Sequence, residues 1–260
     1  MVSNLINANL FRLRRSLSTY VVIGAFAAFM VFVFSVMLGS QMVSSGNAEF
    51  AGVAGRITTD RLFEYIITGD VLCMFTAIGT VVFVHGENAN GNLKNVYGKV
   101  SRKYALVVSK TVSIIPMILS FVGIAGIASV IASLAYAPHR ISFVNSGWTI
   151  LRFTLVQILL LTAVTSLAVC VCVITNSAMV TIIISFLFCE FGISVTSAVT
   201  AQLHKFSAFT LSDYTLLGNL YAITPDSSGM ECLRATAVAL VIIVLTTLIG
   251  SRVLARSDVK

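Results

Sequence analysis

Long apolar runs separated by short polar segments dominate the pattern of this chain. A bilayer core about 30 Å thick needs about 20 apolar residues to be crossed by a helix. Six runs reach or approach that length: residues 19–38, 65–84, 106–134, 151–174, 179–199 and 234–250. The runs are continuous rather than alternating, which indicates helices rather than strands. The pattern therefore predicts an all-α polytopic membrane protein with six transmembrane helices, in a single domain over residues 1–260.

The segment ahead of the first run has a different periodicity. Apolar side chains recur there at helical spacing: Ile6, Leu10, Leu13 and Leu17. Three arginines fall on the other faces of that helix: Arg12, Arg14 and Arg15. An amphipathic helix of this kind lies in the headgroup region with its arginines toward anionic lipid. We therefore predict an interfacial helix over residues 3–18, the alternative being a simple flank of the first span.

A polar stretch, HGENANGNLKNVYGKVSRK at residues 85–103, separates the second run from the third. It contains the spacing of a phosphate-binding loop at Gly86 and Gly91, but Asn92 and Leu93 follow where such a loop has Lys and Ser or Thr. The lysine and hydroxyl that hold phosphate and magnesium are therefore missing. We expect no nucleotide and no other cofactor to bind to this chain itself.

The distribution of Lys and Arg predicts the orientation of the spans. With the N-terminus inside, inner segments hold eleven of the 17 Lys and Arg residues and outer segments hold six. Cytosolic loops carry an excess of these residues, so both termini are expected in the cytosol.

A hydrophobic content of 57 % with only 10 % charged residues excludes an ordinary soluble domain. Orientation accounts for the net charge of +7, so a lipid bilayer is the expected surrounding and nucleic acid is not expected as a partner.

Within the polar stretch, seven residues stand in a distinctive order: Glu87, Gly91, Lys94, Asn95, Gly98, Ser101 and Arg102. They resemble the pattern E-x-x-x-G-T-x-K-N-x-x-x-G-x-S-R of ABC-2 type permeases, the membrane subunits of one class of ABC exporters. Asn92 stands where the family usually has Thr. The basic interfacial helix, the six spans and a short turn at residues 175–178 are also similar to that family. Within it, the chain looks like the small permeases of lantibiotic immunity and bacitracin resistance.

The resemblance implies a function and a set of partners. These seven residues would form a cytosolic coupling helix that docks on a separate ABC ATPase subunit, which holds ATP and Mg. A second permease copy, or a related permease, would complete the transporter in the bacterial plasma membrane. Spans one, two and five would open a path for an amphipathic or hydrophobic cargo, such as an antimicrobial peptide or a drug. The chain itself would not be an enzyme.

Glu190 is the candidate for a functional side chain inside a span. An ionised carboxylate facing lipid costs roughly 2.5 kcal/mol or more, so Glu190 should face protein or water, or be protonated. It would line the substrate path or serve a proton-linked site, or it would be a buried carboxyl hydrogen-bonded to a neighbouring Ser or Thr. Two rival functions follow: an ion-coupled secondary transporter or channel that uses Glu190, and a non-transporting scaffold or sensor subunit.

The remaining polar residues within the spans indicate packing rather than chemistry. Small residues recur every four positions in three spans: Ala125, Ser129, Ser133, Thr162, Ser166, Cys170, Ser177, Thr181, Ser185 and Cys189. Such stripes let helices approach closely. The five cysteines and three histidines lack the spacing of a metal site. Residues 200–233 are too apolar for a free loop, and the family resemblance implies short helices that dip back into the outer leaflet there. Anchoring of aromatic side chains at the membrane interface is the simpler alternative.

Overall fold

The computed structural model describes residues 2–44, 58–89, 104–136, 143–203 and 211–256. Helices form nearly all of these residues, and no strand occurs among them. The elements are α1 (Val2–Arg15), α2 (Leu17–Ser44), α4 (Thr59–Thr68), α5 (Asp70–Ala89), α7 (Tyr104–Tyr136), α8 (Gly147–Thr175), α9 (Ala178–Leu203), η1 (Leu211–Tyr214), α10 (Leu216–Ala222) and α11 (Gly229–Arg256). The predicted all-α class is confirmed.

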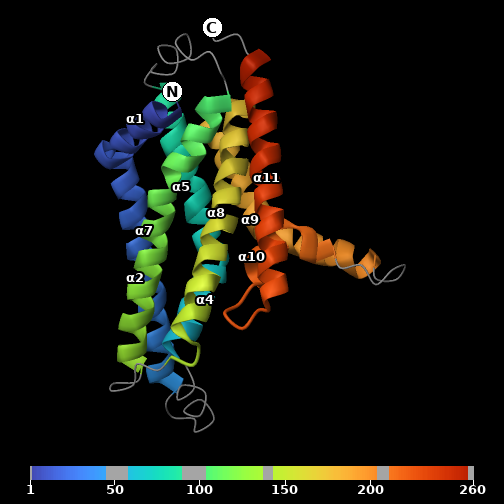
Figure 1. Ribbon diagram of the computed structural model, residues 1–260. Coiled ribbons are helices and arrows are strands. Elements are labelled where there is room, and N and C mark those ends of the chain that lie inside the picture. Colours follow the sequence, from blue (N-terminus) through green and yellow to red (C-terminus); the bar gives the residue numbers. More distant parts are fainter. Residues whose placement is uncertain (1, 45–57, 90–103, 137–142, 204–210, 257–260) are drawn as a thin grey trace.

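The helices run along a common direction, and α1 lies across one end of them (Figure 1). The last turns of α11 reach the same end, which we call the terminal end. The opposite end, which we call the far end, holds the start of α4 and the segments before α8 and α11 (Figure 1). The helix predicted for residues 3–18 is present as α1 (Val2–Arg15).

Four straight helices are long and apolar enough to cross a membrane: α2, α7, α8 and α11. Two bent pairs raise the number to as many as six, if each counts as one span. The first pair joins α4 to α5 at 49°, and the second joins the two parts of α9 at 45°. A polytopic helical membrane protein is therefore shown, while the predicted layout of six spans depends on how the bent pairs cross.

The bend between α4 and α5 interrupts the apolar run predicted at residues 65–84. Gly69 ends α4 with extended backbone angles, φ −73° and ψ 150°. A Cβ atom at Gly69 would lie 3.0 Å from the Tyr65 carbonyl oxygen, so the absence of a side chain allows this close approach. The bend could not be predicted from the composition of the run, because a single Gly hardly changes its mean hydropathy.

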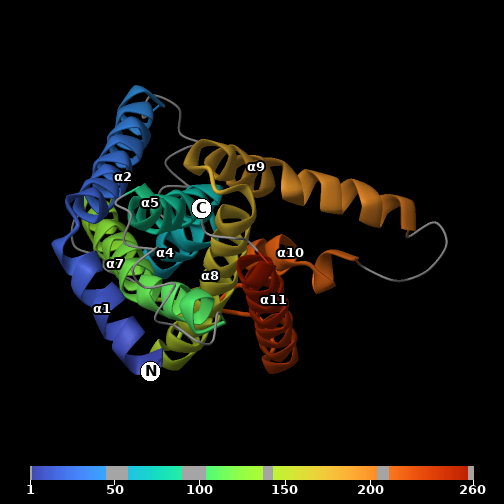
Figure 2. The same ribbon diagram turned by 90° about the horizontal axis from the view of Figure 1, so that it is seen from above.

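Helix α8 is the most buried of the four straight helices and packs on α5, α7, α9 and α11 (Figure 2). Its last residue is followed by Asn176, whose left-handed backbone (φ 50°) closes the helix before α9 begins. An aromatic cluster joins α2, α5 and α7, with ring centroids of Phe26 and Phe75 at 5.3 Å and of Phe26 and Phe121 at 5.0 Å. These contacts form the core around which the remaining helices are placed.

The small-residue stripes face this core, as the packing interpretation predicted. Residues of all three stripes are buried, including Ala125, Ser129, Ser166, Thr181 and Cys189. Most of their hydroxyls donate to a carbonyl three or four residues earlier in their own helix. The Thr246 hydroxyl also donates to the Ser166 oxygen at 2.9 Å and so links α11 to α8. The stripes therefore serve close helix packing.

The chain between α9 and α11 returns to the bundle. The second part of α9 projects away from the other helices (Figures 1 and 2), and η1 and α10 lie back against α9, α8 and α11. Leu216, Leu217 and Leu220 of α10 are buried. A Cβ atom at Gly192, beside the bend in α9, would collide with the Leu217 side chain. Glycine at this position therefore lets α10 approach α9.

Candidate functional site

Helix α1 braces the terminal ends of α5 and α7. The Arg12 guanidinium donates to the Phe83 carbonyl oxygen at 2.8 Å and lies 4.2 Å from the centroid of the Phe83 ring. On the same helix, the Asn9 amide donates to the Ser109 hydroxyl of α7 at 3.3 Å. Leu13 of the same helix is also buried. One face of α1 therefore holds both helices that lead into and out of residues 90–103.

The predicted coupling residues lie almost wholly outside the described residues. Glu87 is in the last turn of α5, and its side chain is not described. The other six fall within residues 90–103: Gly91, Lys94, Asn95, Gly98, Ser101 and Arg102. What is described is the support of this segment, because α5 ends at Ala89 and α7 begins at Tyr104. Whether the segment forms a coupling helix stays a prediction.

The other two arginines of α1 do not turn toward the bundle. Arg14 is exposed, and its carbonyl oxygen accepts a hydrogen bond from the Tyr20 hydroxyl at 2.8 Å. The Arg15 guanidinium lies over the ring of Phe11 on the same helix, 4.6 Å from its centroid. Location of α1 at a membrane surface stays a prediction, and these two side chains are the ones placed to face it.

Lys110 is one of the eleven Lys and Arg residues that the predicted orientation assigns to the inner segments. Its side chain is only 4 % exposed, and it lies within α7 rather than in a polar segment. Burial removes this lysine from the positive charge that a soluble partner could contact. The sequence offered no signal for this, because Lys110 stands close to the predicted boundary of the span.

Glu190 lies on an exposed face of α9. Phe186, Leu187 and Phe191 on that face are also exposed, by 43 %, 48 % and 56 %. The preceding residue points the other way: Cys189 is fully buried, and its Sγ atom lies 3.0 Å from that of Cys73 on α5. Within one chain, Glu190 is therefore not enclosed by its own helices. The Cys73–Cys189 contact was not anticipated, because 116 residues separate the two.

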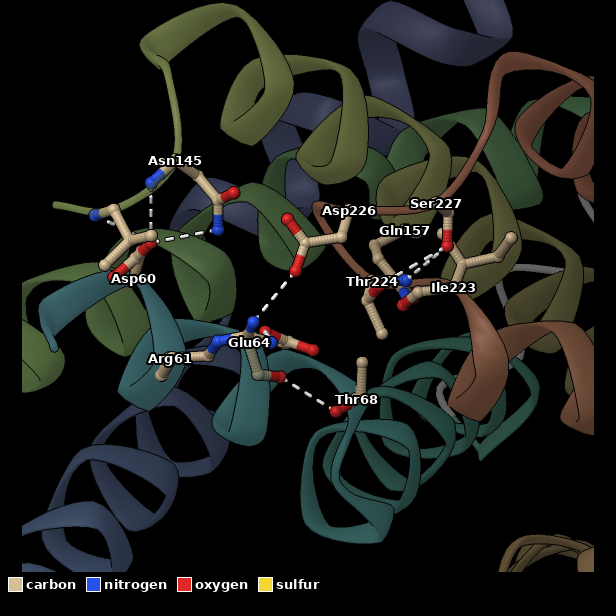
Figure 3. Close-up of polar contacts among 11 residues, drawn as sticks. Asp60, Arg61, Glu64, Thr68, Asn145, Gln157, Ile223, Thr224, Asp226 and Ser227 are labelled. Atoms are coloured by element: carbon tan, nitrogen blue, oxygen red, sulfur yellow. Dashed lines mark hydrogen bonds and ion pairs between the residues drawn. The ribbon is translucent and has the colours of Figure 1, made fainter. Parts of the chain in front are cut away.

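A polar cluster closes the far end of the bundle (Figure 3). The Asp60 carboxylate of α4 is only 2 % exposed. One of its oxygens accepts from the Val144 N–H at 3.2 Å, the Asn145 N–H at 3.0 Å and the Asn145 side-chain amide at 2.9 Å. Asp60 thus fixes the segment that enters α8. Its first neighbour, Arg61, pairs with Asp226 at 2.8 Å and connects α4 to the segment before α11.

Further contacts attach α8 and α11 to the same region. The Arg152 guanidinium of α8 donates to the Ser227 carbonyl oxygen. The buried Gln157 amide donates to the Leu220 carbonyl oxygen at 3.0 Å. It also donates to the carbonyl oxygen of Ile223 at 3.3 Å (Figure 3). Arg234 of α11 pairs with Asp213 of η1 at 3.1 Å. The charged and amide side chains at this end therefore bind other parts of the same chain.

The chain was also compared with known proteins. Neither protein-family models nor curated protein sequences give a match.

Proposed function

We propose that this chain is the membrane permease subunit of an ATP-driven ABC exporter. The observation that carries the proposal is the order of Glu87, Gly91, Lys94, Gly98 and Arg102 between two apolar helices. That order resembles the coupling segment of ABC-2 type permeases. The ATPase would be a separate subunit that binds ATP and Mg, and the cargo would be an amphipathic or hydrophobic molecule such as an antimicrobial peptide or a drug.

The contacts of α1 support this proposal. A segment that transmits force from an ATPase needs rigidly held flanking helices, because flexible flanks would absorb the displacement. The flanking helix ends here belong to α5 and α7, and α1 contacts them through Arg12 and Asn9. A push on residues 90–103 would therefore move α1, α5 and α7 together.

The exposed face of α9 supports a second permease copy as a partner. Glu190 lies there among Phe186, Leu187 and Phe191, all exposed. A carboxylate on an apolar face at membrane depth is unfavourable toward lipid. A second copy, or a related permease, that covered this face would remove Glu190 from lipid and place it beside a shared path.

Purification from native membranes tests the proposal. We expect the tagged chain to bring down a protein that contains a Walker A motif and hydrolyses ATP. The double charge reversal Lys94→Glu and Arg102→Glu should abolish this capture, since complementary charges on the partner would then repel it. The variant should still reach the membrane, because neither residue lies in an apolar run.

Arg252→Glu provides the matched control. Arg252 is an exposed arginine near the terminal end of α11, outside the motif, and its reversal should leave the capture intact. Capture that survives deletion of residues 87–102 would refute the coupling role. Transport driven by an ion gradient and abolished by Glu190→Gln would instead establish the rival secondary transporter. Complex formation with no effect on cargo efflux would establish a scaffold or sensor subunit.

A further inference from the structure

A cavity of about 400 Å³ lies between α2, the bend that joins α4 to α5, and α10. Pockets that bind small ligands usually occupy about 300–1,000 Å³. Its walls are mostly apolar, with aromatic rings contributed by Phe29 and Phe34 of α2 and by Tyr65 of α4. The cavity therefore has the size and lining of a site for a hydrophobic molecule.

One carboxylate stands in this apolar wall. Asp70 is the first residue of α5, directly after the bend at Gly69, and it is exposed to the cavity. It follows Asp60 by ten residues, and the bend at Gly69 lies between the two. Asp70 is therefore separate from the polar cluster at the far end and lies within the bent pair α4–α5.

Asp70 forms no ion pair with the described part of the chain. The Tyr221 hydroxyl of α10 lies beside it, and the N-terminal end of α5 favours a negative charge at this position. A carboxylate among apolar side chains at membrane depth is unfavourable without a cationic partner. The cavity thus combines room for a ligand with a carboxylate that has no ionic partner among the described residues.

Two other cavities of similar volume show that the charge is specific to this one. The cavity between α2 and α7 measures about 390 Å³, and the one between α9, α10 and α11 about 400 Å³. Neither has an Asp, Glu, Lys or Arg side chain among the described residues in its wall. Apolar molecules could enter any of the three, but only the Asp70 cavity discriminates between ligands by charge.

We propose that the Asp70 cavity binds a hydrophobic cation. The positive charge lies beside the Asp70 carboxylate, and the apolar body packs against Phe29, Phe34 and Tyr65. Aromatic ring faces also attract cations, which adds to the preference for positive charge. The shared chemistry fits a free lipophilic cation or a lysine side chain of an amphipathic peptide. As a statement about cargo this rests on the proposed function, whereas the binding itself requires no ATPase.

Binding of radiolabelled tetraphenylphosphonium to the full chain in lipid nanodiscs tests the site, with empty nanodiscs as background. We expect saturable binding that the Asp70→Asn variant weakens by roughly tenfold or more. Asp70→Glu should restore most of the affinity, since it restores the charge. Tetraphenylborate has nearly the same shape and the opposite charge, and it should not displace the cation.

Two further variants keep the test decisive. Glu231→Gln removes an exposed carboxylate in the first turn of α11, which lines none of the three cavities, and should leave the affinity unchanged. Val33→Trp keeps Asp70 but fills the cavity from α2, and it should abolish binding even if Asp70→Asn does not fold. Wild-type affinity in either Asp70→Asn or Val33→Trp would overturn the proposal. Equal displacement by tetraphenylborate, or equal loss in Glu231→Gln, would overturn it as well.

A third arm separates the two sources of the cation. Displacement of tetraphenylphosphonium by a lysine-rich amphipathic peptide, but not by the same peptide with acetylated lysines, assigns the site to peptide side chains. Displacement only by other small lipophilic cations assigns it to those molecules. Cation binding through Asp70 without capture of an ATPase would refute the proposed function while the site stands, and capture without cation binding would do the reverse.

Discussion

The Asp60 carboxylate offers a quantitative test of how the far end is held together. Replacing Asp60 with Ala removes the acceptor of three hydrogen bonds, from the N–H groups of Val144 and Asn145 and from the Asn145 amide. A buried donor left without an acceptor costs about 1–3 kcal/mol. The cluster is only partly buried, so water can replace some of these bonds. We therefore expect Asp60→Ala to lower the free energy of unfolding by about 2–4 kcal/mol.

Asp226→Asn is the matched control in the same cluster. Asp226 pairs with Arg61 at 2.8 Å, but the side chains are 56 % and 51 % exposed. Exposed ion pairs of this kind contribute about 0–1 kcal/mol. Asp60 is buried and accepts three hydrogen bonds, whereas Asp226 forms one exposed ion pair, so their difference in stability measures the contribution of the buried acceptor.

Thermal stability of the detergent-purified protein, followed by loss of the monodisperse peak in size-exclusion chromatography, measures both effects. The Tm should fall on the order of 5–15 °C in Asp60→Ala and by at most about 4 °C in Asp226→Asn. Asp60→Asn should be intermediate, because an amide oxygen still accepts but carries no charge. Equal Tm values for Asp60→Ala and Asp226→Asn would refute the reasoning that burial decides the strength of these contacts.

Two further predictions concern the ends of α1 and the bend in α9. Arg12→Ala should lower the free energy of unfolding by about 1–3 kcal/mol, because both the hydrogen bond and the ring contact with Phe83 are lost. The control Arg14→Ala should change it by no more than about 0.5 kcal/mol. Equal melting temperatures of the two variants would contradict the bracing role of α1. Gly192→Ala should cost about 1–3 kcal/mol by collision with Leu217, and a double-mutant cycle with Leu217→Ala should show that the two changes together cost less than their sum. Additive costs would mean that the two positions do not meet.

Most of the helices could be predicted because their signals are local. A bilayer sets a minimum apolar length, so the runs at residues 106–134 and 151–174 predicted α7 and α8 without any knowledge of their neighbours. The spacing of Leu10 and Leu13 likewise predicted α1. The bend at Gly69 escaped prediction, because its cause is backbone geometry rather than average hydropathy.

The two candidate sites differ in the same way: one could be identified from the sequence, and the other only from the structure. The order of residues in the coupling segment is a property of the sequence, and the resemblance on which the proposed function rests needs no coordinates. Asp70 had no such signal in the sequence. It is a candidate ligand-binding group because the bend places its side chain in the wall of a cavity that α2 and α10 also line.

Composition and periodicity act over a few helical turns, so they suffice to predict a helical membrane protein with a polar segment between two apolar helices. Which side chains meet depends instead on how the helices pack. Glu190 and Cys189 are neighbours in sequence, yet one is exposed and the other touches Cys73. Asp60 finds its partner at Asn145, 85 residues away. An apolar helix has no strongly polar face to set its rotation, so packing against the other helices determines which residues point inward.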